Sequence, residues 1–162
     1  MSWTAPSAVE RQAILRRTGT VAMVGASANP ARASNFVATY LLSSTAFDVY
    51  FVNPNATEIL GRPVYASLAD LPVVPDLIDV FRRPEDLGGV LDEAIAVSGE
   101  HAERASTFWT QFGLYDEDLA HRGEAAGLTV VMDRCLKVEH ARFHGGLHLA
   151  GFNTGVISAR RR

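Results

Sequence analysis

The chain has 162 residues, 48% of them hydrophobic and 20% charged, which indicates one globular domain that is able to bury a core. Its formal net charge of −3 gives no electrostatic attraction to nucleic acid or to an anionic membrane, so neither is expected as a partner. The absence of a recognisable signal peptide and of an apolar run long enough for a membrane span, together with a single cysteine, Cys135, predicts a cytoplasmic protein without internal disulfides.

The pattern of apolar residues predicts helices and strands that alternate along the chain. An N-terminal helix is expected within residues 1–18, and Ser34 is expected to cap a later helix that follows the first strand. The strands are predicted at 20–24, 48–52, 77–81, 106–111 and 129–132, and the helices between them at 35–43, 84–97 and 116–126. Between the second and third strands, a short extended piece is expected at 61–65 and a helical turn at 67–71.

The predicted strands are short and almost uniformly apolar, as in a parallel sheet whose two faces are both covered. We therefore expect a single α/β domain over residues 1–162, with a doubly wound, mostly parallel five-stranded sheet and helices on both faces. In such a fold the ligand crevice lies at the carboxyl ends of the strands. Residues 136–162 are expected to form a C-terminal tail that packs on the domain or on a partner subunit, which leaves a homodimer open.

The segment after the first strand is typical of a phosphate-binding turn. Gly25 ends the strand, and Ser27, Arg32 and Ser34 follow it before the next helix, whose exposed backbone N–H groups can accept an anion. The turn holds one glycine where the dinucleotide fingerprint has three, and Pro30 widens the loop because it has no N–H to donate. A ligand with phosphate is predicted, but not the usual dinucleotide.

The second strand lacks the acidic residue that binds ribose hydroxyls in many dinucleotide-binding domains. Val52, Asn53 and Pro54 stand at its end instead. A carboxylate there would repel a phosphate on the ribose, so its absence, together with Arg32, favours a ligand with a phosphorylated ribose. NADP and coenzyme A (CoA) both fit this description.

The third and fourth strands end in residues that suit the same kind of ligand. Phe81 and Arg82, with Arg83 next to them, offer an aromatic face and guanidinium groups for a base or a phosphate. Gln111 and Gly113 offer an amide and a flexible backbone after the fourth strand. The four strand ends together predict a site for a polyanionic nucleotide.

Taken in order, these motifs resemble the small stand-alone CoA-binding proteins of bacteria, which are related to the CoA-binding domain of the succinyl-CoA synthetase alpha subunit. The resemblance is carried by Val-Ala-Met-Val-Gly25-Ala-Ser27, Val52-Asn-Pro-Asn55, Asp79-Val-Phe-Arg-Arg-Pro84, Trp109-Thr-Gln-Phe-Gly113, Val131-Met-Asp-Arg-Cys135 with Glu139-His140, and Gly151-Phe-Asn-Thr-Gly155. It implies a Rossmann-like domain that binds CoA or an acyl-CoA across the carboxyl ends of the strands.

The resemblance also implies a role for each candidate residue. Beneath and beside the phosphates it places Gly25, Ala26, Ser27, Arg32 and Ser34. It places Val52, Asn53 and Pro54 at the adenosine end. It places Phe81 and Arg82 beside the nucleotide, and Gln111 and Gly113 along the pantetheine arm.

Two other features of the sequence could form sites. His140, His144 and His148 would share one helix face and could ligate zinc or nickel, but two glycines at 145 and 146 interrupt that helix, so no metal site is expected. Cys135 is expected to be a small packing residue, with a reactive thiol next to Arg134 as the alternative.

The residues predict a binding protein and not an enzyme. No Ser/His/Asp set and no paired carboxylates converge by their spacing, so no catalytic residues are expected. The expected function is to carry or sense CoA or an acyl-CoA without chemistry of its own. The alternative is an NADP-binding oxidoreductase or redox-sensing module.

Overall fold

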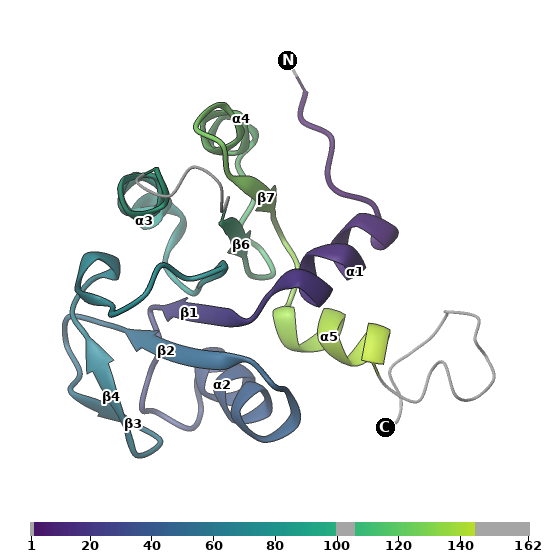
Figure 1. Cartoon of the computed structure of the whole chain (residues 1–162). Helices are drawn as coiled ribbons and strands as arrows, with labels where there is room; N and C mark the ends of the chain where they lie inside the picture. Colours follow the sequence, from purple (N-terminus) through teal and green to yellow (C-terminus); the bar gives the residue numbers. More distant parts are fainter. Residues whose placement is uncertain (1, 100–105, 145–162) are drawn as a thin grey trace.

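In the computed structural model, which describes residues 2–99 and 106–144, helices and strands alternate around one central sheet (Figure 1). The strands are β1 (Thr20–Val24), β2 (Asp48–Val52), β3 (Glu58–Ile59), β4 (Arg62–Tyr65), β5 (Leu77–Val80), β6 (Thr107–Thr110) and β7 (Thr129–Val131). The α-helices are α1 (Ala8–Arg17), α2 (Ala33–Ser44), α3 (Leu87–Ser98), α4 (Glu117–Ala125) and α5 (Leu136–His144), and two short 3₁₀ helices are η1 (Leu68–Asp70) and η2 (Pro84–Asp86).

The strands form one sheet in the order β3-β4-β2-β1-β5-β6-β7. Every pairing is parallel except that of β3 with β4. From β1 the chain first winds outward through β2 to β3 and β4, and then returns to β5 on the other side of β1. This reversal makes the fold doubly wound, with its topological switch point between β1 and β5, and confirms the expected class.

The predicted number of five strands is wrong, because β3 and β4 extend the sheet. The piece predicted as extended at 61–65 is β4, which pairs with β2 through only Phe51↔Val64 and Val52↔Tyr65. Its first residues, Arg62 and Pro63, are exposed, so β4 has no apolar run like that of the buried strands. The five strands that were predicted are all present, within one or two residues of their expected ends.

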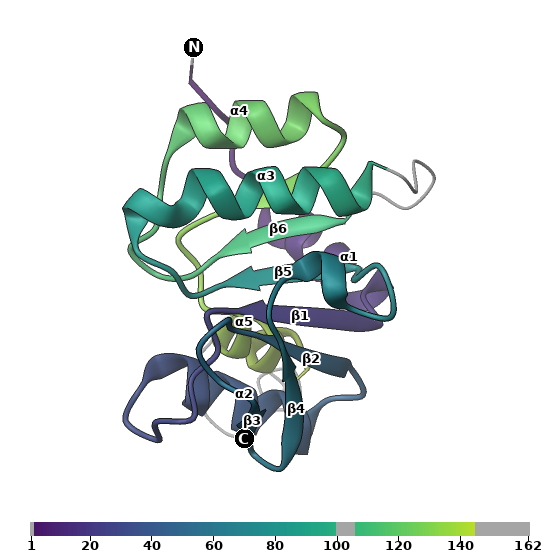
Figure 2. The same ribbon diagram turned by 90° about the vertical axis from the view of Figure 1, so that its left-hand side faces the viewer.

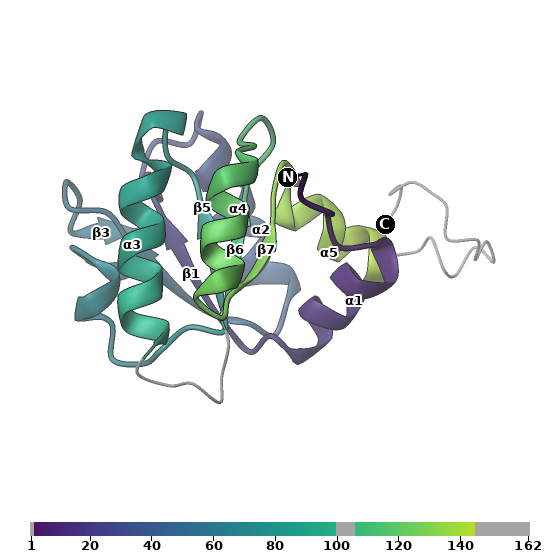
Figure 3. The ribbon, with the colours of Figure 1, turned by 90° about the horizontal axis from the view of Figure 1, so that it is seen from above.

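Two layers of helices cover the sheet, as the views of Figures 2 and 3 show. Helices α3 and α4 pack on one face, and α1, α2 and α5 pack on the other. The alternation of side chains along β1 divides the core accordingly: Val21 and Met23 pack with the second group, and Ala22 and Val24 with the first. Because both faces are buried, the strand edge at the carboxyl ends is left as the place for a ligand.

Helix α1 begins at a capping box in which Ser7 and Glu10 satisfy each other's backbone N–H groups. Its Arg11 reaches α5, where the Nε atom lies 2.7 Å from Oε1 of buried Glu139. The terminal helices therefore lie side by side on one face of the sheet (Figure 1).

The first part of the predicted C-terminal tail is α5, which packs on α1 and α2. Residues 145–162, with His148 and the motif at 151–155, lie outside the described residues. Glu139 accepts ion pairs from Arg11, Arg134 and Arg142, and Nδ1 of His140 lies 2.8 Å from the hydroxyl oxygen of Tyr40. Within residues 2–99 and 106–144, no group of three metal-ligating side chains is present. None of the helices described there is long and apolar enough to cross a bilayer.

Candidate functional site

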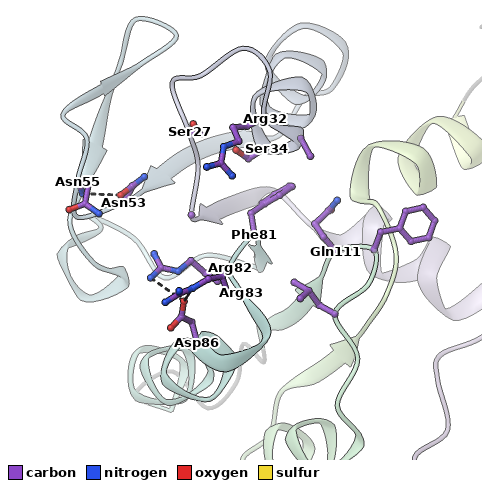
Figure 4. Close-up of a pocket in the computed structure, with 14 residues that line it drawn as sticks. Ser27, Arg32, Ser34, Asn53, Asn55, Phe81, Arg82, Arg83, Asp86 and Gln111 are labelled. Carbon is purple, nitrogen blue, oxygen red and sulfur yellow. Dashed lines mark hydrogen bonds and ion pairs between the residues drawn. The ribbon is translucent and has the colours of Figure 1, made fainter.

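A cleft of about 620 Å³ opens at the carboxyl ends of β1, β2, β5 and β6, at the topological switch point (Figure 4). Its walls come from the segments that follow these four strands and from the first turn of α2. The lining residues are Gly25, Ser27, Arg32, Ala33, Ser34, Asn53, Asn55, Phe81, Arg82, Arg83, Asp86, Gln111, Phe112 and Leu114. This is where a ligand is expected in an open α/β sheet, and the volume lies in the range of small-molecule sites.

Gly25 brings the end of β1 into contact with the end of β5. Its φ is +88°, and a Cβ atom added to it would lie 2.3 Å from the carbonyl oxygen of Phe81. Its N–H donates to the carbonyl of Val52, while the N–H of Phe81 donates to the carbonyl of Val24. Only glycine combines this backbone conformation with this close approach, so the floor of the cleft depends on it.

The loop between β1 and α2 holds its own shape through side-chain hydrogen bonds. Ser27 Oγ accepts from the N–H of Asn29, and Asn29 Oδ1 accepts from the N–H of Ala31. Asn35 Nδ2 donates to the carbonyl of Ser27. Since Ser27 Oγ is the acceptor in its bond, its hydroxyl hydrogen is available to a ligand.

Helix α2 presents free N–H groups to the cleft. The helix starts at Ala33 with Arg32 as its N-cap, and the Arg32 side chain makes no capping hydrogen bond. The prediction that Ser34 caps this helix is therefore wrong, because Ser34 lies within the first turn and is 4% exposed. In the described part of the chain the N–H groups of Ala33 and Ser34 have no acceptor, and a helix N-terminus favours an anion at such donors.

Arg32 adds a full positive charge beside these donors. Its side chain is exposed, and no carboxylate of the described residues pairs with it. An unpaired guanidinium next to free backbone N–H groups can hold a phosphate by charge-assisted hydrogen bonds.

On the α3 side of the cleft, two more arginines share one carboxylate (Figure 4). Asp86 Oδ2 lies 3.1 Å from Nε of Arg83 and 3.8 Å from Nη2 of Arg82. The hydrogen bond and the charge of Asp86 raise the pKa of Arg83 above its ordinary value, with a further contribution from Glu85.

Two amide side chains frame the cleft and also tie its loops together. Asn53 Nδ2 donates to the carbonyl of Ala26, and Asn53 Oδ1 accepts from the N–H of Asn55. Gln111 Oε1 accepts from the N–H of Leu136 at the start of α5. Hydrogen bonds therefore join the loop after β1 to the loop after β2, and the loop after β6 to the segment after β7.

The structure brings together most of the residues predicted from the sequence. Those that line the cleft are Gly25, Ser27, Arg32, Ser34, Asn53, Phe81, Arg82 and Gln111. Val52 and Pro54 line an adjoining cavity of about 230 Å³ that also contacts Arg82 and Asp86. Whether a ligand touches these residues stays a prediction.

The other two predicted residues, Ala26 and Gly113, line neither the cleft nor the adjoining cavity. Ala26 is fully buried and contributes its carbonyl to Asn53. Gly113, with φ +87°, donates its N–H to Asp133 Oδ1 at 2.6 Å, so its loop is tied to the end of β7. The lining residues absent from the predicted set are Ala33, Asn55, Arg83, Asp86, Phe112 and Leu114. Arg83 and Asn55 both belong to the motifs that carry the family resemblance, and each is the third residue after its strand.

The fold and the cleft define a Rossmann-like nucleotide-binding domain. The chain belongs to the CoA binding domain family, whose model matches residues 19–141. It is 36% identical over 136 residues to the uncharacterized protein YneT of Bacillus subtilis (strain 168), a match that covers 84% of this chain and 96% of that protein.

Solved structures are similar over the same range. A hypothetical protein from Pyrococcus horikoshii OT3 is 34% identical with a TM-score of 0.78, and the match covers 90% of this chain and 100% of that one. The structure of cell-free ID.343 from Thermus thermophilus is 35% identical with a TM-score of 0.75, and the match covers 85% and 98% of the two chains.

Proposed function

We propose that this chain binds CoA or an acyl-CoA in the cleft and carries or senses it without catalysing a reaction. The observation that carries the proposal is the set of unpaired donors at the start of α2, where the Arg32 guanidinium and the N–H groups of Ala33 and Ser34 have no partner among the described residues. In a chain of the CoA binding domain family, such donors suit the phosphates of CoA.

The cleft suggests how CoA lies in it. One phosphate of the diphosphate binds the N–H groups of Ala33 and Ser34 and the hydroxyl of Ser27, and the other faces Arg82 and Arg83. Arg32 takes the 3′-phosphate of the ribose, which no acidic residue at the end of β2 repels. The pantetheine arm then runs toward Gln111, and its thiol or acyl group lies outside the part of the site that holds the nucleotide.

The non-catalytic role rests on the kinds of side chain in the cleft. Among the described residues that line it there is no histidine, cysteine or lysine, and the ionisable groups are three arginines and Asp86. Asp86 is the one carboxylate among these lining residues, so they hold no pair of acid and base for a reaction.

NADP is the second candidate, and one observation favours it. Strand β2 ends in Val52 and the amide Asn53, so a 2′-phosphate on the ribose would be tolerated as well as a 3′-phosphate. An oxidoreductase or a redox-sensing module would follow from tight binding of NADP(H).

Calorimetric titration of nucleotide-stripped protein with CoA and with NADPH separates the two. We expect saturable binding of CoA, weaker binding of NADPH, and a rise in melting temperature with CoA, since a ligand that binds the folded state stabilises it. Arg32→Ala should weaken CoA binding. Arg16→Ala is the matched control, because Arg16 is an exposed arginine of α1 outside the cleft. Tight binding of NADPH without heat from CoA would overturn the proposal.

A further inference from the structure

Asp86 stands in the part of the cleft where the arginines would attract a phosphate. It follows β5 as the last residue of η2 and is the N-cap residue of α3. Its side chain contacts both the main cleft of about 620 Å³ and the adjoining cavity of about 230 Å³. Figure 4 shows it with Arg82 and Arg83 on one side of the cleft and Arg32 on the other.

The two sides of the cleft differ in the state of their guanidinium groups. Arg32 has no carboxylate partner in the described chain, so it can take an anion at once. Arg82 and Arg83 already share Asp86 Oδ2, at 3.8 Å and 3.1 Å. A phosphate that approaches them must compete with a carboxylate of this chain.

We propose that Asp86 is an internal counter-ion of Arg82 and Arg83, which the phosphate of the CoA diphosphate that is not bound at α2 displaces from them. Asp86 thereby lowers the affinity of this side of the cleft for phosphate. This inference rests on the function proposed above. It assigns to Asp86 a role in affinity and assigns no chemistry to it.

The contacts of Asp86 suit a displaceable group. Its side chain is 28% exposed, and those of Arg82 and Arg83 are 33% and 72% exposed, so water screens both ion pairs. A phosphate offers more charge and more acceptor oxygens than a carboxylate, so it can replace Asp86 at these guanidinium groups. While Asp86 stays charged, it also repels the incoming phosphate. A neutral ligand neither has to displace Asp86 nor is repelled by it.

The test is the dissociation constant of CoA for Asp86→Asn, measured by calorimetry beside the wild-type chain. Asparagine keeps the shape of the side chain, and Asp86 makes no capping hydrogen bond to α3 that could be lost, so the fold is retained, which the melting temperature checks. Removing the competing charge should tighten CoA binding by roughly three- to tenfold. The gain should be smaller when Arg82 and Arg83 are both replaced by alanine, because no ion pair is then broken and only the repulsion between Asp86 and the phosphate is relieved.

Glu85→Gln is the matched control. Its carboxylate lies 3.6 Å from Nη1 of Arg83, but it does not line the cleft, so CoA binding should change less than twofold. Unchanged CoA binding by Asp86→Asn would overturn the inference. Weaker CoA binding would also overturn it, because it would show that Asp86 accepts a hydrogen bond from a ligand hydroxyl. A folded wild-type chain that binds no CoA would instead overturn the proposed function.

Discussion

The buried carboxyl of Asp79 gives a prediction about stability that is independent of any ligand. Asp79 lies in β5 between Met23 and Trp109, is 0% exposed, and neither of its oxygens has a hydrogen-bond partner among the described residues. Burial raises the pKa of this carboxyl well above its ordinary value of 3.8. The folded chain therefore keeps a proton that the unfolded chain releases.

The sign of the pH dependence follows from this difference in bound protons. Above about pH 4 the unfolded state binds fewer protons at this site than the folded state, so the free energy of unfolding falls as the pH rises. The loss is about 1.4 kcal/mol for each pH unit until the pKa of the folded state is reached. Asp79→Asn cannot titrate and should escape this loss.

Urea denaturation of both chains at a series of pH values from about 4.5 upward measures the effect. The stability of Asp79→Asn relative to wild type should grow with pH by about 1.4 kcal/mol per unit. Asp48→Asn, an exposed carboxylate at the start of β2, is the control and should leave the slope of the wild type unchanged. A difference in stability between Asp79→Asn and wild type that stays constant with pH would show that Asp79 does not keep its proton in the folded chain.

Three further substitutions test the site and its support. Gly25→Ala should lower the free energy of unfolding by at least about 2 kcal/mol in urea, because its Cβ would lie 2.3 Å from the Phe81 carbonyl oxygen at a φ of +88°; unchanged stability would contradict the close approach. Arg32→Ala should weaken the binding of CoA by about 1–3 kcal/mol, measured by calorimetry, and the binding of dephospho-CoA by less. Equal losses for the two ligands would place Arg32 away from the 3′-phosphate. Glu139→Ala should cost about 3–5 kcal/mol of stability, since it leaves buried Arg11 without its ion pair, and a loss below about 1 kcal/mol would show that the pair is not needed.

The strands of the sheet centre could be predicted because their sequences leave little choice. β1 and β2 are apolar runs that end at Gly25 and at Asn53-Pro54, and both strands have the bounds expected from the sequence. The strands β3 and β4 were harder because they are short and partly exposed at the sheet edge. The pairings of β4 with β2 and of β3 with β4 are tertiary contacts that leave no periodic signal in the sequence.

The candidate site was predictable as far as topology determines it. Parallel strands bring their carboxyl ends to one edge, so Gly25, Phe81 and Gln111 meet there although they are far apart in the sequence. Asp86 was not predicted, because a carboxylate in a phosphate site goes against charge complementarity. Gly113 does not line the cleft, and its N–H donates to Asp133 instead. No local pattern in the sequence indicates this hydrogen bond.

A crystal structure of the chain with CoA would show whether α2 and Arg32 form the proposed phosphate site. We expect a phosphate of the diphosphate within hydrogen-bond distance of the N–H groups of Ala33 and Ser34, and the 3′-phosphate at the guanidinium of Arg32. A cleft left empty at saturating CoA, or CoA phosphates bound elsewhere on the chain, would contradict it.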